Sequence, residues 1–597
     1  MGRIVGSQRP LAGKPASAKF IAARALLASA GVIFYASTAF AAIPIQHWTQ
    51  PSGAQVYLVE SMAIPMLDVQ VDFDAGSRRD PADKAGLASV TALIAGKGVA
   101  ARDGQPALDE NQLGEAWADL GASFGGSAGD DRMSFQLRTL TEPDLLQKSV
   151  HLAARELGDP AWPDDVWQRE RQRLSAAIKE SRTRPGTIAA LAYQKAVYGG
   201  HPYGYDTTPE TLARIGIGDM RARYAELIRP CRAKVSLVGA VTRAQADQIV
   251  TQLLSRLPQG AACAPLPAVA EVAPLAASKD ERIPFESAQA HVLIGQPGYK
   301  RSDPDFFPLL VGNHILGGGG FTSRLTTQVR EKRGLSYSVY SYFAPGLHAG
   351  AFTAGLQTRP DQAAEALAVS KQVIADFVQN GPTAGELKAA KDNLIGGFPL
   401  RLDGNRKLLD NVANIAWNNL PLDYLEHWTE RVNAVTADQI KAAFQRVLQP
   451  EKMVTVVVGG AVPSSQAKEA ASVVRTSASS SEIRSGQRSP LPLATWPSGD
   501  GAALACRRFR WRPCASTPAA QRSKIPVIPA QAGINAALLR SRTLVVWTRF
   551  WIPACRNDGC WSGRGASDVR EKSRLMPHVQ RQPQRRHVVA VAAQNLF

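Results

Sequence analysis

An internal repeat constrains the fold of this chain more than any other feature. Gly239-Ala240-Val241 follows an apolar run and opens a helical pattern, and Gly460-Ala461-Val462 stands in the same setting 221 residues later. A repeat of this length predicts two homologous halves, each of about that size. A chain of 597 residues is also too long for a single core, which agrees with more than one domain.

Each half mixes alternating apolar strands with amphipathic helices, which predicts an α+β fold of two α/β-sandwich halves, each a mixed sheet covered by helices. In the first half we expect strands over 69–73 and 131–140 and helices over 87–95, 143–156, 164–181 and 219–227. In the second half we expect strands over 291–294, 336–342 and 351–356, with helices near 306–316, 324–330, 360–379 and 383–393.

Composition divides the chain into five segments. We expect a signal peptide at 1–41, an N-terminal domain at 42–262, a linker at 263–285, a C-terminal domain at 286–475 and a basic tail at 476–597. The linker is rich in Ala and Pro, which favours a semi-extended chain. In the signal, basic residues precede an apolar run that ends in Ala39-Phe40-Ala41, a small-x-small cleavage pattern.

This signal predicts export to the periplasm without stable membrane insertion. The alternative is an uncleaved anchor, although the apolar run 25–40 is short for a spanning helix. The tail looks like the translation of a repetitive intergenic bacterial element, so we expect a fortuitous extension, with a genuine basic module as the alternative. Low order is the expectation for the tail in both cases.

The net charge of +18 is confined to the two ends of the chain. Residues 476–597 hold 19 Lys and Arg against 5 Asp and Glu, a balance of +14, and the signal adds +5, so residues 42–475 sum to 18 − 14 − 5 = −1. A nearly neutral body gives no electrostatic footprint for nucleic acid.

Two of the six cysteines, Cys231 and Cys263, lie in the body, and the other four lie in the tail. Their spacing matches no zinc or redox motif. In an oxidising compartment Cys231 and Cys263 could form a disulfide, but the sequence leaves the paired and the unpaired states both open.

The most informative motif is residues 317–343, in which Arg330 and Tyr337 stand seven residues apart behind a glycine loop of Gly317, Gly318, Gly319 and Gly320. This stretch resembles the second-half signature of the pitrilysin, insulinase and mitochondrial-processing-peptidase superfamily of zinc peptidases. No Gly-Lys-Ser/Thr follows the glycines, so a phosphate-binding loop is not indicated. We expect a flexible loop beside a substrate chamber, with a plain turn as the alternative.

The superfamily places His-x-x-Glu-His on a first-half helix, where two histidines grip zinc, the glutamate acts as general base and a later helix supplies a third ligand. Here residues 76–88 are similar to the approach to that helix, but the ligand and base positions hold Ser89, Ala92 and Leu93, and the later ligand falls on Ala177. No pair among the nine histidines is spaced i and i+4, and His201, beside Pro and Gly, reads as structural. The resemblance therefore implies a degenerate metal site and no zinc in this chain.

In related enzymes the Arg and Tyr that match Arg330 and Tyr337 reach across the chamber of a clamshell, hold substrate backbone and steady the oxyanion. A guanidinium fork and a phenol suit that role, because both donate hydrogen bonds to developing negative charge. The alternative makes Arg330 a surface cation and Tyr337 a strand-edge aromatic.

The resemblance, which covers roughly residues 48–475, implies a non-catalytic, substrate-binding subunit of an exported heteromeric zinc peptidase. Its partners would be a zinc-bearing subunit of the same superfamily and an extended peptide, with zinc as a cofactor of the partner alone. Two alternatives share the fold and stay open: a structural subunit with no role in proteolysis, and a stand-alone peptide-binding protein.

Overall fold

The computed structural model describes Gly2 and residues 43–260 and 263–460. The predicted signal peptide (1–41) and tail (476–597), together with Ala461 and Val462 of the repeat, lie outside these described residues. Within the described ranges, no helix is long and apolar enough to cross a membrane.

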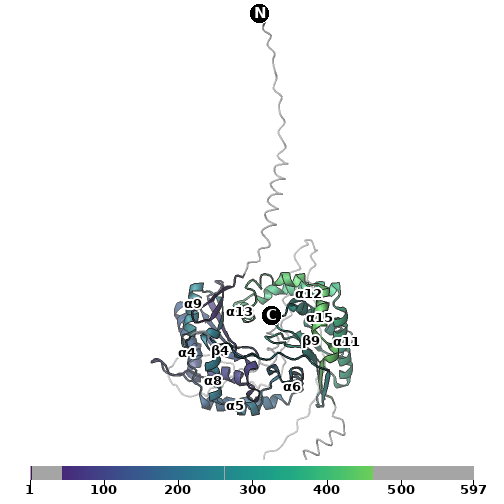
Figure 1. The fold of residues 1–597 in the computed structure, drawn as a ribbon, viewed down its shortest axis with the longest axis horizontal. Helices are drawn as coiled ribbons and strands as arrows, with labels where there is room; N and C mark the ends of the chain where they lie inside the picture. The colour runs from purple at the N-terminus through teal and green to yellow at the C-terminus, as the bar shows by residue number, and fades with distance from the viewer. Residues whose placement is uncertain (1, 3–42, 261–262, 461–597) are drawn as a thin grey trace, which may run out of the picture. The chain divides into compact units, whose positions relative to one another are not determined.

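The first half is built on a six-stranded sheet in the order β1-β2-β6-β3-β5-β4. Its edge strand β4 is labelled in Figure 1. Neighbouring strands are antiparallel except β2 and β6, which are parallel. Alternation along β3 sends Leu67, Val69 and Val71 into the core of this half. The strands are β1 (Gln46–Thr49), β2 (Gln55–Glu60), β3 (Met66–Phe73), β4 (Ser123–Ala128), β5 (Met133–Leu140) and β6 (Lys234–Gly239).

The second half repeats this topology in a five-stranded sheet of order β7-β11-β8-β10-β9, in which only β7 and β11 are parallel. Strand β11 starts at residue 454 and its counterpart β6 at 234, a separation of 454 − 234 = 220 residues. The predicted α+β class and repeated halves are therefore confirmed. The strands are β7 (Lys279–Ile283), β8 (Ala290–Pro297), β9 (Ser338–Phe343), β10 (Ala351–Thr358) and β11 (Val454–Val458).

Helices cover both sheets, and two of the predicted helices, α2 and α5, match the structure in both bounds. Gly86 and Gly96 flank α2 and Pro163 precedes α5, whereas Arg182 at the end of α5 is not a residue that favours helix termini. The first-half helices are α2 (Leu87–Ala95), α3 (Glu110–Asp119), α4 (Pro143–Gly158), α5 (Asp164–Ser181), α6 (Pro185–Tyr198), α7 (Pro209–Ala213), α8 (Ile217–Leu227) and α9 (Arg243–Leu254). The second-half helices are α10 (Phe306–Asn313), α11 (Ala363–Asn380), α12 (Ala384–Gly397), α13 (Asn405–Trp417), α14 (Trp428–Ala434) and α15 (Ala437–Val447).

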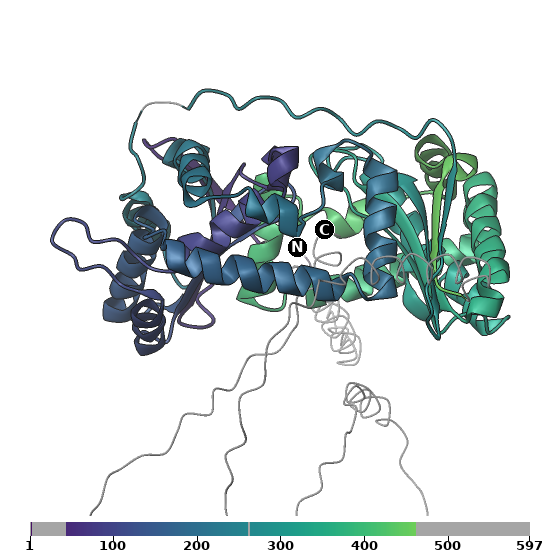
Figure 2. The same cartoon turned by 90° about the horizontal axis from the view of Figure 1, so that it is seen from below.

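The two halves exchange one helix each. First-half helix α6 packs on β8 and β11 of the second sheet, and second-half helix α13 packs on β6, β3 and β2 of the first sheet. Figure 2 shows the blue ribbon of α6 against the strands of the second sheet. The two helices are counterparts in the repeat, because they start at residues 185 and 405, a separation of 405 − 185 = 220.

The exchanged helices are held in different ways. Helix α6 presents Ala189, Tyr193 and Val197 to an apolar cluster of the second sheet, and the Tyr193 hydroxyl donates to the Phe352 carbonyl at 2.7 Å. At the end of α13, Lys234 Nζ from the first sheet donates to the Ala416 carbonyl at 2.7 Å. A cation there satisfies a free carbonyl at the negative end of the helix dipole.

Three predicted boundaries in the second half are corrected by the structure. The predicted linker 263–285 ends earlier, because Lys279–Ile283 forms β7 and pairs in parallel with β11. The charged sequence of β7 is typical of an edge strand and hid it from the apolar pattern. The predicted helix 306–316 is α-helical only to Asn313 and continues as the π-helical turn η5 (His314–Gly318). The strand predicted over 336–342 begins at Ser338.

A disulfide joins Cys231 to Cys263, with a Cα–Cα distance of 5.8 Å, so the paired state is the one in the structure. Further along the same segment, His201 Nε2 lies 3.0 Å from the Ala270 carbonyl, and Lys300 Nζ donates to Glu271 at 2.7 Å. His201 therefore anchors the connection between the halves, which agrees with its structural interpretation.

We expect removal of the disulfide to destabilise the protein. The bridge closes a loop with a sequence separation of 32 residues, for which loop-closure entropy gives about 2–4 kcal/mol of stabilisation. A Cys231→Ser/Cys263→Ser variant should lose about that much free energy of unfolding in urea titrations. Reductant should destabilise the wild type by a similar amount and leave the variant unchanged, and equal midpoints for wild type and variant would contradict the prediction.

Candidate functional site

Arg330 and Tyr337 lie at the two ends of a short connection between a helix and an edge strand. The helix begins after Ser323, whose Oγ accepts from the Thr326 backbone N–H at 3.4 Å, and its later part is the π-helical segment η7 (Thr326–Glu331). Arg330 lies in the last turn of η7, the chain reverses at Gly334 with φ of 63°, and Tyr337 immediately precedes β9.

The structure brings the two predicted residues together. The Arg330 guanidinium carbon lies 4.8 Å from the centroid of the Tyr337 ring and 4.7 Å from that of Phe321. Tyr337 is 83% exposed and Phe321 is 68% exposed. Within the described ranges the Arg330 side chain makes no hydrogen bond or ion pair, so its guanidinium N–H donors are free for a ligand.

The connection itself is firmly held although its side chains are exposed. Leu335 is buried, and its N–H donates to the Val329 carbonyl at 3.0 Å. The Thr358 hydroxyl donates to the Leu335 carbonyl at 2.5 Å, and the Ser336 hydroxyl donates to the Gln357 carbonyl at 2.7 Å. The second sheet therefore fixes the backbone that presents Arg330 and Tyr337.

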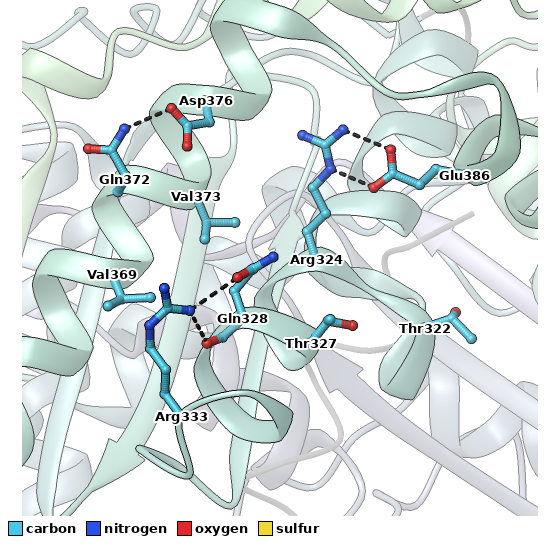
Figure 3. A pocket seen from close by; sticks show the side chains of 10 residues that line it. All are labelled: Thr322, Arg324, Thr327, Gln328, Arg333, Val369, Gln372, Val373, Asp376 and Glu386. Atoms are coloured by element: carbon cyan, nitrogen blue, oxygen red, sulfur yellow. Dashed lines mark hydrogen bonds and ion pairs between the residues drawn. The ribbon is translucent and has the colours of Figure 1, made fainter.

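A hollow of about 410 Å³ lies between η7 and helices α11 and α12 (Figure 3). Arg324 spans it with a two-pronged ion pair to Glu386, at 2.6 and 2.7 Å. Burial alone would raise the pKa of Glu386, but hydrogen bonds from Arg324 and Thr383 lower it to about 2. Arg330 and Tyr337 are not among the residues that line the hollow. We therefore interpret the ion pair that spans the hollow as an anchor for the helix that carries Arg330.

The glycine run is packed rather than loose. A Cβ at Gly317 would come within 2.4 Å of the Ser341 hydroxyl, and one at Gly319 within 2.6 Å of the His314 carbonyl. Gly320 has open space around it but a φ of 61°, which other residues adopt at a cost. Gly317 and Gly318 complete a π-helical turn and Gly320 opens a short 3₁₀ turn, and the flexibility of this loop stays a prediction.

The degenerate metal positions offer no ligand set. Ser89 and Ala177 are exposed, Leu93 is half-buried and Ala92 is buried. Ala92, Leu93 and Ala177 carry no atom that could bind zinc, and zinc sites use Cys, His, Asp or Glu. In the part of the chain that the structure describes, no group of three such residues could hold a metal ion.

The segment before α2 contains a side chain, Asp80, that caps this helix. The Asp80 carboxylate accepts from the backbone N–H groups of Gly86 and Ala88, at 3.1 and 3.0 Å. Burial raises the pKa of Asp80 to about 6, while these hydrogen bonds and Arg223 oppose the rise. The family-like framing of the metal helix is therefore accounted for by helix capping, which does not need the metal.

Phe321 is the site residue that the sequence interpretation missed. The sequence signal for Phe321 was its position directly after the glycine run. An isolated aromatic residue at the end of a loop does not indicate which residue it contacts. Only the turn made by Gly319 and Gly320 brings the ring to Arg330, and that turn is a three-dimensional feature.

Comparisons with known proteins identify similar sequences and folds. A family model described as "Peptidase M16 inactive domain" matches residues 214–394. The crystal structure of a peptidase M16 inactive domain from Pseudomonas fluorescens is 34% identical, with a TM-score of 0.66 over 70% of this chain and 98% of that chain.

Two curated relatives are more distant in sequence. An uncharacterized zinc protease of Streptomyces coelicolor is 27% identical over 299 residues, which are 48% of this chain and 64% of the relative. The Helicobacter pylori protein named non-peptidase homolog YmxG is 25% identical over 390 residues, which are 64% of this chain and 86% of the relative.

Two repeated, helix-covered sheets that keep the second-half signature define a peptidase-like protein, and residues 43–260 and 263–460 hold no zinc site. The chain belongs to the M16 peptidase family, and the inactive-domain model matches the part of it that carries Arg330 and Tyr337.

We expect zinc binding to be restored by returning ligands to these positions. Two histidines at 89 and 93 would share one face of α2, and a glutamate at exposed position 177 would supply the third ligand. The triple variant Ser89→His/Leu93→His/Ala177→Glu should retain about one zinc per chain after desalting, as measured by elemental analysis. The matched control keeps Ser89→His and Ala177→Glu but carries Leu93→Gln in place of Leu93→His, and it should retain no more zinc than the wild type. Equal zinc content in all three proteins would contradict the prediction.

Proposed function

We propose that this chain is the non-catalytic, substrate-binding subunit of an exported zinc peptidase, and that it supplies Arg330 and Tyr337 to an active site completed by a zinc-bearing partner. The observation that carries the proposal is the free guanidinium of Arg330, presented beside the exposed Tyr337 ring by a firmly held backbone. An arginine whose side chain has no internal hydrogen-bond acceptor, on a backbone that is held in place, is arranged for a ligand rather than for stability.

The chemistry of the pair suits peptide hydrolysis on a neighbouring metal. The partner's zinc would supply an activated water, and hydrolysis of a peptide bond would place negative charge on the carbonyl oxygen. Arg330 and the Tyr337 hydroxyl are donors that could meet this charge, and donors of this kind act on the transition state more than on the substrate. The chain's own residues would bind and polarise, and the partner would supply the metal and the base.

An extended peptide is the substrate class that the sheets favour. Strands β4 and β9 each pair on one side only, so each sheet has an open edge at that end. Peptides bind such edges by adding a strand, with main-chain hydrogen bonds that select for extended backbone. Strand β9 follows Tyr337 directly, which would bring a peptide on that edge close to the pair.

Export and pairing complete the proposal. The expected signal at 1–41 would direct the chain to the periplasm, where the Cys231–Cys263 disulfide can persist. Because this chain lacks zinc ligands at the family positions, hydrolysis would require a second chain that carries them.

We expect peptide hydrolysis only when this protein and a zinc-bearing family partner are mixed. Cleavage of an unstructured fluorogenic peptide should be absent for this protein alone and present in the mixture. Arg330→Ala should lower kcat/KM of the mixture by about 100-fold, and Tyr337→Phe by about tenfold, because each removes a donor to the developing charge.

Lys332→Ala is the matched control, since Lys332 is an exposed cation two residues from Arg330 and should leave the rate unchanged. Full activity of both site variants with intact association would favour a structural subunit. Peptide binding without any association with a peptidase would favour a stand-alone peptide-binding protein.

A further inference from the structure

Arg330 is held differently from the other arginines of its helix. Arg324 is fixed by the Glu386 carboxylate, and Arg333 donates to the Gln328 carbonyl at 2.8 Å. The described contacts of Arg330 are the two rings of Phe321 and Tyr337. A ring face attracts a cation without accepting a conventional hydrogen bond, so this environment orients the guanidinium and leaves its five N–H donors unused.

Packing in the core does not explain the position of the Phe321 side chain. Its side chain is 68% exposed, so burial in the core contributes little to holding it there. Its backbone is nevertheless fixed, because the Ser323 N–H and hydroxyl both donate to the Gly320 carbonyl, at 3.1 and 2.8 Å. The Thr322 hydroxyl donates to the Gly319 carbonyl at 3.1 Å. A tightly turned loop thus places an exposed ring over the guanidinium.

The charge around Arg330 is not balanced locally. Residues 330–333 contain Arg330, Lys332 and Arg333 against one acid, Glu331, which is exposed. A free guanidinium in a basic surrounding matches a carboxylate in charge and in planar, two-pronged geometry. A main-chain carbonyl would satisfy the donors but not the charge.

We propose that Phe321 is a positioning residue for Arg330, and that the two together select extended peptides that carry an acidic side chain at the position facing Arg330. This inference rests on the proposed function and deepens it by naming the substrate class. Phe321 acts through Arg330: its ring holds the guanidinium in the orientation that receives the carboxylate. Tyr337 forms the second ring contact with Arg330, and it also has a role in the proposed hydrolysis.

The test measures binding of two fluorescein-labelled peptides to the full exported chain by fluorescence anisotropy. The peptides are unstructured and differ only in a central glutamate or glutamine. We expect the glutamate peptide to bind about tenfold more tightly, as a charge-assisted pair predicts. Phe321→Leu should reduce this preference about threefold, Phe321→Tyr should retain it because the ring is kept, and Arg330→Ala should abolish it.

A double-substitution cycle separates positioning from a general structural effect. In an Arg330→Ala background, Phe321→Leu should change the affinity for neither peptide, because its effect passes through Arg330. Leu400→Ala, at an apolar side chain that is 66% exposed elsewhere on the second half, is the matched control and should leave the preference intact.

Three results would overturn the inference: equal affinity for the two peptides, a Phe321→Leu variant that keeps the full preference, or no binding of either peptide. Failure of the proposed function is a different result. If the preference follows Phe321 and Arg330 while the mixture with a zinc-bearing partner never hydrolyses peptide, the inference stands and the hydrolytic role falls. If hydrolysis depends on Arg330 without any acidic preference, the reverse holds.

Discussion

The exchange of helices α6 and α13 is the interaction on which the rest of the structure depends. Each sheet has one face completed by a helix that belongs to the other half of the sequence. The second sheet, which carries β9 and the connection to Arg330, is covered in part by Tyr193 of α6 and the apolar cluster around it. Neither half is complete alone, so we infer that the two repeats fold as one cooperative structure.

The stability of the fold does not depend on the missing zinc ligands. Asp80 caps α2 through backbone hydrogen bonds, and Ser89 and Ala177 face solvent, so the helix does not depend on a bound metal. In small zinc domains the metal is itself the source of folding energy. Here two apolar cores supply it, and the metal positions were free to change while the fold persisted.

The sequence was sufficient for features that repeat or that end in distinctive residues. The 221-residue repeat predicted the two sheets, and Gly86, Gly96 and Pro163 lie at both ends of α2 and at the start of α5. Strand β7 was hidden because its residues are charged and its stability comes from pairing with β11. Helices α6 and α13 were not predicted, and a helical pattern would in any case give no indication of the sheet on which each helix packs.

The residues of the candidate site also divide into those that the sequence predicted and one that only the structure revealed. Arg330 and Tyr337 were recognisable from their spacing in a motif, whereas Phe321 joins them only through the turn at Gly319 and Gly320. The packing that requires Gly317 was equally invisible, since the atoms it would meet belong to Ser341 in a strand further along the chain.

The Cys231–Cys263 bridge also changes what a protease can do to this molecule. A cut anywhere between these cysteines would break the polypeptide, yet the two fragments would stay covalently joined at the base of the connection between the halves. With α6 and α13 still exchanged, such a nicked protein would keep both sheets covered. A protease that cuts at this point would therefore leave a protein that behaves as one molecule until a reductant separates its pieces.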